Sequence, residues 1–223
     1  MSPTPSVIVF DVNETLSDMT PLASRFSDIG APEHLATLWF ATLLRDGFAL
    51  TAAGAQRPFA ELGVDALHSV LNGVDTDRDL DAAVDHVMQG FGELELHADV
   101  AEGIRALHRS GRRLVTLSNG SPQVADRLFV DAGIRDEFEA LLSVEDAGAW
   151  KPARAAYEYA AETCHTELAD MLLVAVHPWD IDGAARAGMA TAWITRTALP
   201  YPGCFTAPSL TVTSLLDLAA QLT

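Results

Sequence analysis

The sequence predicts an α/β protein: a doubly wound parallel sheet with helices on both faces, and an all-helical block inserted after the first strand. Three observations predict this fold. Short runs of apolar and β-branched residues recur along the chain, helical segments separate most of them, and one long stretch has helical periodicity without a convincing strand. Continuous apolar strands are typical of parallel sheets, which are buried on both faces. Their alternation with helices favours the doubly wound arrangement.

The predicted core strands share one form, an apolar run that stops abruptly at polar residues. The run VIVF stops at Asp11, RLVTL stops at Ser118, and MLLVAV stops at His177. The five predicted strands cover residues 7–10, 113–117, 140–143, 171–176 and 191–195.

Helical patterns separate these strands. The predicted core helices cover residues 100–108, 122–132, 153–163 and 181–187. Gly111, Gly133 and Gly188 follow three of them, at the position where a glycine commonly ends a helix.

The inserted block has apolar residues at helical spacing around residues 34–48, 59–71 and 80–91. Gly54 and the Asn72-Gly73 pair separate these helices. We therefore expect two domains: an α/β core with the active site over residues 1–19 and 97–223, and a helical cap domain over residues 20–96. Ligands of open α/β sheets bind beyond the carboxyl ends of the strands, so a block inserted there is well placed to close over one.

Composition narrows the function classes. At 223 residues, the chain can bury a substantial core and still carry a smaller second unit. Its formal net charge of −17 disfavours nucleic acid and acidic membrane surfaces as partners, because both would repel it. Two cysteines without metal-ligand spacing, and an N-terminus without a signal peptide or membrane span, indicate a cytoplasmic protein.

Polar residues cluster where the predicted strands end, and a parallel sheet brings those ends together. Asp11 follows the first strand, Ser118 follows the second, and His177 and Asp180 follow the fourth. A single aspartate in such a place is usually a helix cap or a turn residue. The coincidence of several polar strand ends favours an active site that includes Asp11.

Four ordered motifs resemble those of the haloacid dehalogenase superfamily. They are FDVNETLSD at residues 10–18, LSNG at residues 117–120, Lys151-Pro152 and Trp179-Asp180. Their order and spacing agree with the family along the whole chain, and the helical insertion lies where the family's common cap lies. The resemblance implies a Rossmann-like core and a hydrolase that uses Asp11 as its nucleophile.

Two positions distinguish branches of this superfamily. Its phosphate-ester hydrolases need an acid two residues after the nucleophile, where this chain has Asn13, and an acidic Mg²⁺ ligand where it has Ala175. A halide leaves as a stable anion and needs no acid. The resemblance therefore implies the type II, L-2-haloacid dehalogenase branch. Members convert short-chain (S)-2-haloacids into (R)-2-hydroxyacids through an aspartyl ester, without a metal or another cofactor.

The resemblance also implies roles for the catalytic residues. Lys151 keeps Asp11 ionised, Thr15 orients it, and Asp180 holds and deprotonates the hydrolytic water. His177 has two interpretations that stay open: a base beside Asp180, or a residue that only shapes the turn.

The expected substrate-binding residues fall into three groups. One binds the substrate carboxylate, one lies around the leaving halide, and one shapes the pocket. Ser118 and the backbone near Val12 and Asn13 are expected to bind the substrate carboxylate, and Arg45 and Asn119 the halide. Phe59 and Trp179 would form apolar walls of the pocket, and Tyr157 would position Lys151.

Departures from the dehalogenase pattern leave the natural substrate and the halogen, fluoride included, open. This chain has Asn13 where the pattern has an aromatic residue, and Ala175 and His177 where it has serine and asparagine beside the hydrolytic water. Two other functions stay as alternatives: a Mg²⁺-dependent phosphatase with unusual metal ligation, and an inactive binding or scaffold member. The resemblance makes a homodimer a reasonable expectation.

Overall fold

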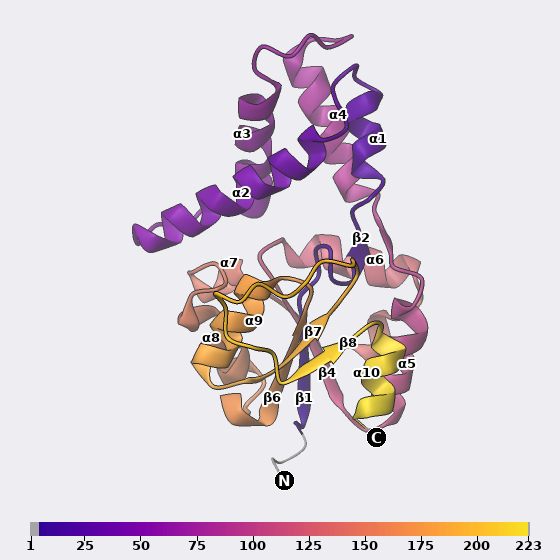
Figure 1. The fold of residues 1–223 in the computed structure, drawn as a ribbon, viewed down its shortest axis with the longest axis vertical. Helices are drawn as coiled ribbons and strands as arrows, with labels where there is room; N and C mark the ends of the chain where they lie inside the picture. Colours follow the sequence, from indigo (N-terminus) through magenta and orange to yellow (C-terminus); the bar gives the residue numbers. More distant parts are fainter. Residues whose placement is uncertain (1–4, 223) are drawn as a thin grey trace. The chain divides into compact units, whose positions relative to one another are not determined.

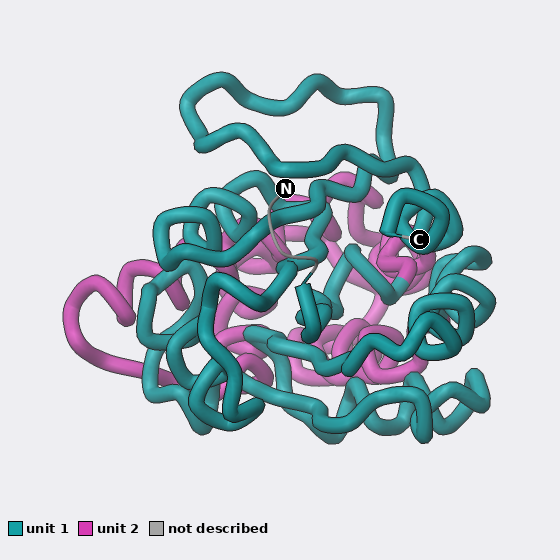
Figure 2. The backbone as a smooth tube through the Cα atoms, turned by 90° about the horizontal axis from the view of Figure 1, so that it is seen from below, with its two compact units in different colours: residues 1–17, 96–223 teal, residues 18–95 magenta. Residues whose placement is uncertain are grey.

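The computed structural model describes residues 5–222 and divides into two compact units. Figure 2 shows them in teal and magenta: the core unit, residues 1–17 and 96–223, and the helical unit, residues 18–95. Within residues 5–222, none of the helices is both long and apolar enough to cross a membrane.

The core unit is built on a six-stranded parallel sheet with the strand order β5-β4-β1-β6-β7-β8 (Figure 1). All five predicted core strands are present, with ends that differ by one residue at most. β8 was not predicted, because three residues are too few to show a strand pattern. The strands are β1 (Val7–Phe10), β4 (Arg113–Ser118), β5 (Ala140–Ser143), β6 (Met171–Ala175), β7 (Ala190–Ile194) and β8 (Leu210–Val212).

Helices cover both faces of this sheet, which confirms the predicted doubly wound α/β fold. On one face, the apolar cluster of the sheet includes residues of α5 (Val100–Arg109), α6 (Pro122–Asp131) and α10 (Leu215–Gln221). α8 (Arg154–Thr163) and α9 (Pro178–Ala187) pack on other strand residues. Three short helical segments complete the unit: η1 (Arg135–Glu137), α7 (Val144–Ala147) and η2 (Leu168–Asp170).

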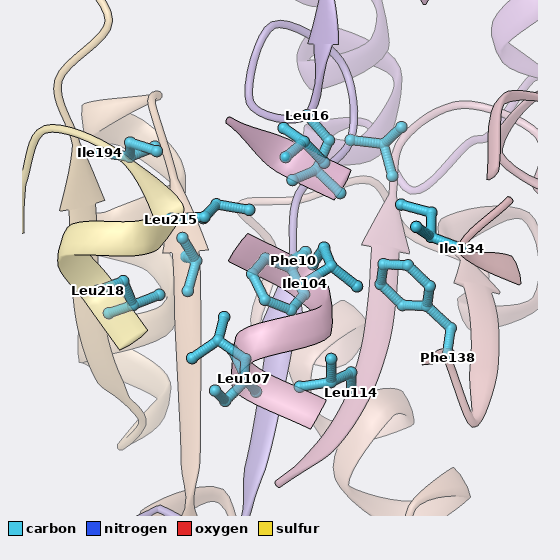
Figure 3. Close-up of a cluster of buried hydrophobic side chains, with 14 of the residues drawn as sticks. Phe10, Leu16, Ile104, Leu107, Leu114, Ile134, Phe138, Ile194, Leu215 and Leu218 are labelled. Atoms are coloured by element: carbon cyan, nitrogen blue, oxygen red, sulfur yellow. The ribbon is translucent and has the colours of Figure 1, made fainter. Parts of the chain in front are cut away.

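Figure 3 shows how the side chains of the first face interlock. Phe10 of β1, Ile104 of α5 and Leu215 of α10 belong to this cluster, and all three are fully buried. Burial of such side chains contributes roughly 1.5–3 kcal/mol each. The residues that follow β1 are therefore attached to a rigid part of the core from which water is excluded.

The predicted capping glycines confirm the helix ends. Gly111, Gly133 and Gly188 have φ values of 83°, 64° and 109°, and they follow α5, α6 and α9. This left-handed backbone is the conformation in which glycine replaces other residues at a helix C-terminus.

The helical unit contains α1 (Leu22–Ser27), α2 (Leu35–Ala52), α3 (Phe59–Leu71) and α4 (Leu80–Gly92). The three long helices match the predicted ones, whereas the six residues of α1 were too short to be predicted. The indole N–H of Trp39 donates to the carbonyl of Gly63 at 2.9 Å, and Phe91 stacks on Phe59 with ring centroids 5.2 Å apart. At its margins, β2 (Ser17–Asp18) and β3 (Glu95–Leu96) pair as a two-stranded sheet.

Gly183 lies where α9 closely approaches the loop after residue 150. A β-carbon added at Gly183 would lie 2.6 Å from the side chain of Pro152 and 2.6 Å from the hydroxyl of Tyr157. Contacts this short require the loop or the helix to move, since neither the Pro152 backbone nor the buried Tyr157 ring can yield freely.

We therefore expect Gly183→Ala to lower the free energy of unfolding by about 1–3 kcal/mol through overpacking. The matched control is Gly92→Ala in α4, where an added β-carbon would meet nothing within 4 Å. Because alanine is the better helix former, the control should be neutral or stabilised by up to about 1 kcal/mol. Urea unfolding of the whole chain measures both, and a wild-type midpoint for Gly183→Ala would show that this contact is loosely packed.

Candidate active site

The candidate site lies at the carboxyl ends of β1, β4 and β6 (Figure 1). Phe10 of β1 pairs in register with Thr116 of β4 and with Val174 of β6. The residues that follow these strands therefore emerge at one edge of the sheet. Strand order reverses at β1, and such switch points are where open α/β sheets bind ligands.

Three buried charges form the centre of the site. The ammonium Nζ of Lys151 lies 2.9 Å from Oδ1 of Asp11 and 2.6 Å from Oδ2 of Asp180. The side chains of Lys151 and Asp180 are 0% exposed and that of Asp11 is 5% exposed. Each distance is that of a charge-assisted hydrogen bond, so one cation joins two carboxylates out of contact with bulk water.

The electrostatics of this centre favour an ionised Asp11. Burial by itself raises the pKa of Asp11, but the charge of Lys151 and the hydrogen bond from His177 lower it well below its usual range. Burial lowers the pKa of Lys151, and the two carboxylates more than restore it, so the ammonium keeps its proton. Burial is the main cause that raises the pKa of Asp180. The two aspartates therefore differ: one is a stable carboxylate, and the other is the better proton acceptor.

Thr15 holds the second carboxylate oxygen of Asp11. Its hydroxyl donates to Oδ2 at 2.6 Å and accepts from the amide of Val176 at 3.1 Å. Its carbonyl accepts from the guanidinium of Arg196 at 2.9 Å, and Arg196 also pairs with Asp99. Arg196 was not among the residues predicted from the sequence. Its one indication there was that basic residues are few, with only 14 lysines and arginines in the chain.

His177 lies between two carboxylates. Its Nδ1 is 3.0 Å from Oδ2 of Asp11, and its Nε2 is 2.8 Å from Oε2 of Glu14. Burial lowers the pKa of His177, but the hydrogen bonds with Asp11 and Glu14 raise it to about 9. A histidine that holds its proton at neutral pH has no lone pair with which to act as a base in the free protein. Glu14 was missed, although its place three residues after Asp11 was a visible signal.

Tyr157 and Asn119 support the buried charges, each through a neighbour. The Tyr157 hydroxyl donates to Oδ1 of Asp180 at 2.7 Å, and the other oxygen of that carboxylate contacts Lys151. The Asn119 side chain bonds the backbone of Lys151 twice: it accepts from the amide at 3.0 Å and donates to the carbonyl at 3.4 Å. Asn119 therefore holds the segment that carries Lys151.

The residues expected to bind the substrate carboxylate lie beside Asp11. Ser118 ends β4, and its hydroxyl accepts from the amide of Gly120 at 2.9 Å, which leaves its own proton available. Within residues 5–222, the backbone amides of Val12 and Asn13 donate no hydrogen bond to a protein acceptor. Amides of this kind next to a hydroxyl are a common way to bind an anion.

Trp179 contributes an apolar surface to the same centre. Its ring stacks on His177 with centroids 4.8 Å apart, and Lys151 Nζ lies 6.0 Å from its ring centroid.

The helical unit holds the two remaining candidates, Arg45 and Phe59. The Arg45 side chain on α2 is 68% exposed and pairs with its neighbour Asp46 at 2.8 Å. Phe59 begins α3 and is buried in that unit's own core against Phe91. Their roles toward a substrate stay predictions.

Carboxylate and imidazole groups of the described part of the chain do not form a set of three or more that could hold a metal ion. Ala175, the last residue of β6, presents a methyl group where the superfamily's Mg²⁺ enzymes have an acidic ligand. The residues present thus do not fit such a magnesium site.

Known proteins that are similar in sequence to this chain are dehalogenases. The family model for haloacid dehalogenase-like hydrolases matches residues 5–188. The (S)-2-haloacid dehalogenase of Pseudomonas sp. strain YL is 31% identical over 93% of this chain and 90% of its own length. Haloacetate dehalogenase H-2 of Moraxella sp. strain B is 30% identical over 92% of each chain.

Solved structures agree with the sequence relatives. An L-2-haloacid dehalogenase superposes with a TM-score of 0.92 at 28% identity, over 98% of this chain and 99% of that one. A dehalogenase with an intermediate complex gives a TM-score of 0.91 at 25% identity, over 99% and 98%. From its family match, its relatives and the geometry of its strand ends, the chain belongs to the haloacid dehalogenase-like hydrolases.

Proposed function

We propose that this protein hydrolyses short-chain (S)-2-haloacids to (R)-2-hydroxyacids through an ester on Asp11, without a metal. The observation that carries this proposal is the buried Asp11–Lys151–Asp180 centre, in which a cation from the protein itself keeps the nucleophile ionised. Relatives named as (S)-2-haloacid dehalogenases over nearly their whole length support it.

The first half-reaction is a displacement by one oxygen of Asp11. Oδ2 already accepts hydrogen bonds from Thr15 and His177, whereas Lys151 is the one donor to Oδ1 within the described residues. Oδ1 therefore keeps a lone pair free, and we assign it as the attacking atom. It forms a bond to C2 of the substrate while the carbon–halogen bond breaks and its electron pair leaves with the halide.

The second half-reaction opens this ester. Water adds to Cγ of Asp11 and gives a proton to Asp180, whose pKa is raised by burial. The Cγ–Oδ1 bond then breaks, and Lys151, 2.9 Å from Oδ1, donates a proton to the departing alkoxide. Asp180 returns a proton to Lys151 across their 2.6 Å contact. The carboxyl group left on Asp11 then loses its proton to solvent. The hydroxyl oxygen of the product comes from Asp11.

The substrate carboxylate needs its own binding groups, because Asp11 would otherwise repel it. We assign this role to the hydroxyl of Ser118 and the backbone amides of Val12 and Asn13, which no protein acceptor takes within residues 5–222. These donors lie on the residues that directly follow β1 and end β4, so their positions are fixed by the sheet.

For the helical unit, we propose the role of the family's cap domain, with a domain division at residues 19/20 and 96/97. Arg45 would then bind the leaving halide together with Asn119, and Phe59 with Trp179 would form apolar walls around C2. We also propose a cytoplasmic location and a homodimer, as the family resemblance implies.

The alternatives are less well supported. A phosphatase would need a leaving-group acid, and Asn13 cannot supply a proton near neutral pH. A scaffold would gain nothing from a buried lysine and two buried aspartates, since burying charges costs free energy that apolar residues of similar size would not.

Halide release tests the function directly. With L-2-chloropropionate, we expect the wild-type protein to release chloride at the same rate with and without excess EDTA. Asp11→Asn should release chloride more slowly by a factor on the order of 10³ or more. The exposed Asp85→Asn is the matched control and should behave as wild type. Absence of halide from chloro-, bromo- and fluoro-acids would reject the proposal. Mg²⁺-dependent hydrolysis of p-nitrophenyl phosphate that Asp11→Asn abolishes would favour the phosphatase.

Arg45 tests the role proposed for the helical unit. Because the side chain is largely exposed, Arg45→Ala should leave the free energy of unfolding unchanged. Loss of a cation at the leaving halide should lower kcat/KM for halide release by about 10²-fold. Arg127→Ala, an exposed arginine of α6 in the core unit, is the control. Equal kcat/KM for both variants would show that Arg45 takes no part in turnover.

A further inference from the structure

His177 and Glu14 form a pair whose role the two half-reactions above do not explain. Both ring nitrogens of His177 face carboxylate oxygens, Asp11 Oδ2 at 3.0 Å and Glu14 Oε2 at 2.8 Å. A carboxylate accepts and does not donate, so the ring satisfies both contacts only as an imidazolium with two N–H groups. The ring is 10% exposed and lies flat against Trp179, which fixes its orientation.

The backbone of Glu14 is held in an unusual conformation that aims its side chain at His177. Its φ is 60°, in the left-handed region that non-glycine residues rarely occupy. Its carbonyl lies 3.0 Å from Nε2 of His97, and its carboxylate, 42% exposed, reaches His177. A turn of this kind is retained only where the surrounding structure holds it, which suits a residue kept for a function.

We propose that His177, held charged by Glu14, joins Thr15 as an oxyanion hole for the ester-opening half-reaction. This rests on the proposed function, in which Oδ1 of Asp11 attacks and Oδ2 becomes the ester carbonyl oxygen. When water adds to Cγ, the π electron pair of the Cγ–Oδ2 bond moves onto Oδ2. Oδ2 then carries the negative charge that Thr15 and His177 already face, at 2.6 Å and 3.0 Å. Donors placed in advance at a developing charge stabilise a transition state most effectively.

The same geometry separates the two half-reactions. In the first, a cation beside Asp11 stabilises the carboxylate ground state and gives no advantage to its attack. In the second, Oδ2 changes from a neutral carbonyl to an oxyanion, so a charged donor acts on the transition state alone. His177 is then a catalytic residue for ester hydrolysis, and Glu14 is a positioning residue that acts through it.

The pair also predicts a pH dependence. Four charged groups bear on His177: Asp11 and Glu14 in direct contact, and Lys151 and Asp180 through Asp11. Burial lowers the pKa of His177, and both carboxylates raise it, to about 9 in the free protein. Esterification removes the charge of Asp11, so the pKa of His177 falls and Glu14 alone holds the imidazolium. Ester hydrolysis should therefore slow as pH rises through this lowered pKa.

Rapid-quench kinetics with L-2-chloropropionate in excess over the enzyme, recorded over a pH series, test the proposal. We expect His177→Asn and Glu14→Gln to release one equivalent of chloride in a burst at the wild-type rate. Hydroxyacid should then appear about 10–100-fold more slowly, while the Asp11 peptide accumulates as an ester by mass. Glu14→Gln should move the alkaline loss of the slow step to lower pH. His177→Asn, a neutral donor, should remove that loss. His68→Asn on α3 is the matched control.

Two results would overturn the proposal and leave the function standing: variants that form hydroxyacid as fast as wild type, or variants in which the chloride burst slows as much as ester hydrolysis. A rate for ester hydrolysis that rises with pH and vanishes in His177→Asn would instead make His177 a base. If wild-type protein releases no chloride, the proposed function itself is wrong. Glu14→Gln, at a half-exposed side chain, keeps the test available if His177→Asn fails to fold.

Discussion

The buried ammonium of Lys151 is the interaction on which the rest of the site depends. It lies fully enclosed between Asp11 and Asp180, and removing it would leave two buried carboxylates without a compensating charge. Breaking such a buried pair costs about 3–5 kcal/mol, so the arrangement must form completely or not at all. The sheet brings the two carboxylates together. Asp11 follows β1, Asp180 lies on α9 shortly after β6, and β1 and β6 pair in register.

The two oxygens of Asp11 have different surroundings, and the proposed chemistry follows from that asymmetry. Oδ1 faces Lys151, a cation that can also give up a proton, whereas Oδ2 faces two donors that hold it in place. One oxygen is therefore suited to leave with the product and the other to carry transient charge. Asp180 completes the cycle, because its contact with Lys151 connects the water's proton to the departing oxygen.

The sequence predicted the sheet well because each long strand is a local apolar run, as in Met171–Ala175. β8 and α1 were missed because three and six residues carry no measurable periodicity. At the site, strand ends and motif order indicated Asp11 and Lys151. The partner of Tyr157 and the pairing of Glu14 with His177 could not be predicted, since both depend on where side chains meet across elements far apart in sequence.

A single turnover in H₂¹⁸O, with enzyme in excess over L-2-chloropropionate, tests most directly whether Asp11 forms an ester that water opens at Cγ. After turnover, the peptide that contains Asp11 and the released lactate are analysed by mass spectrometry. We expect one ¹⁸O atom in the Asp11 peptide and none in the lactate, because the product hydroxyl carries away Oδ1. Label in the lactate with an unlabelled Asp11 peptide would mean that water attacks the substrate directly, which would contradict an ester on Asp11.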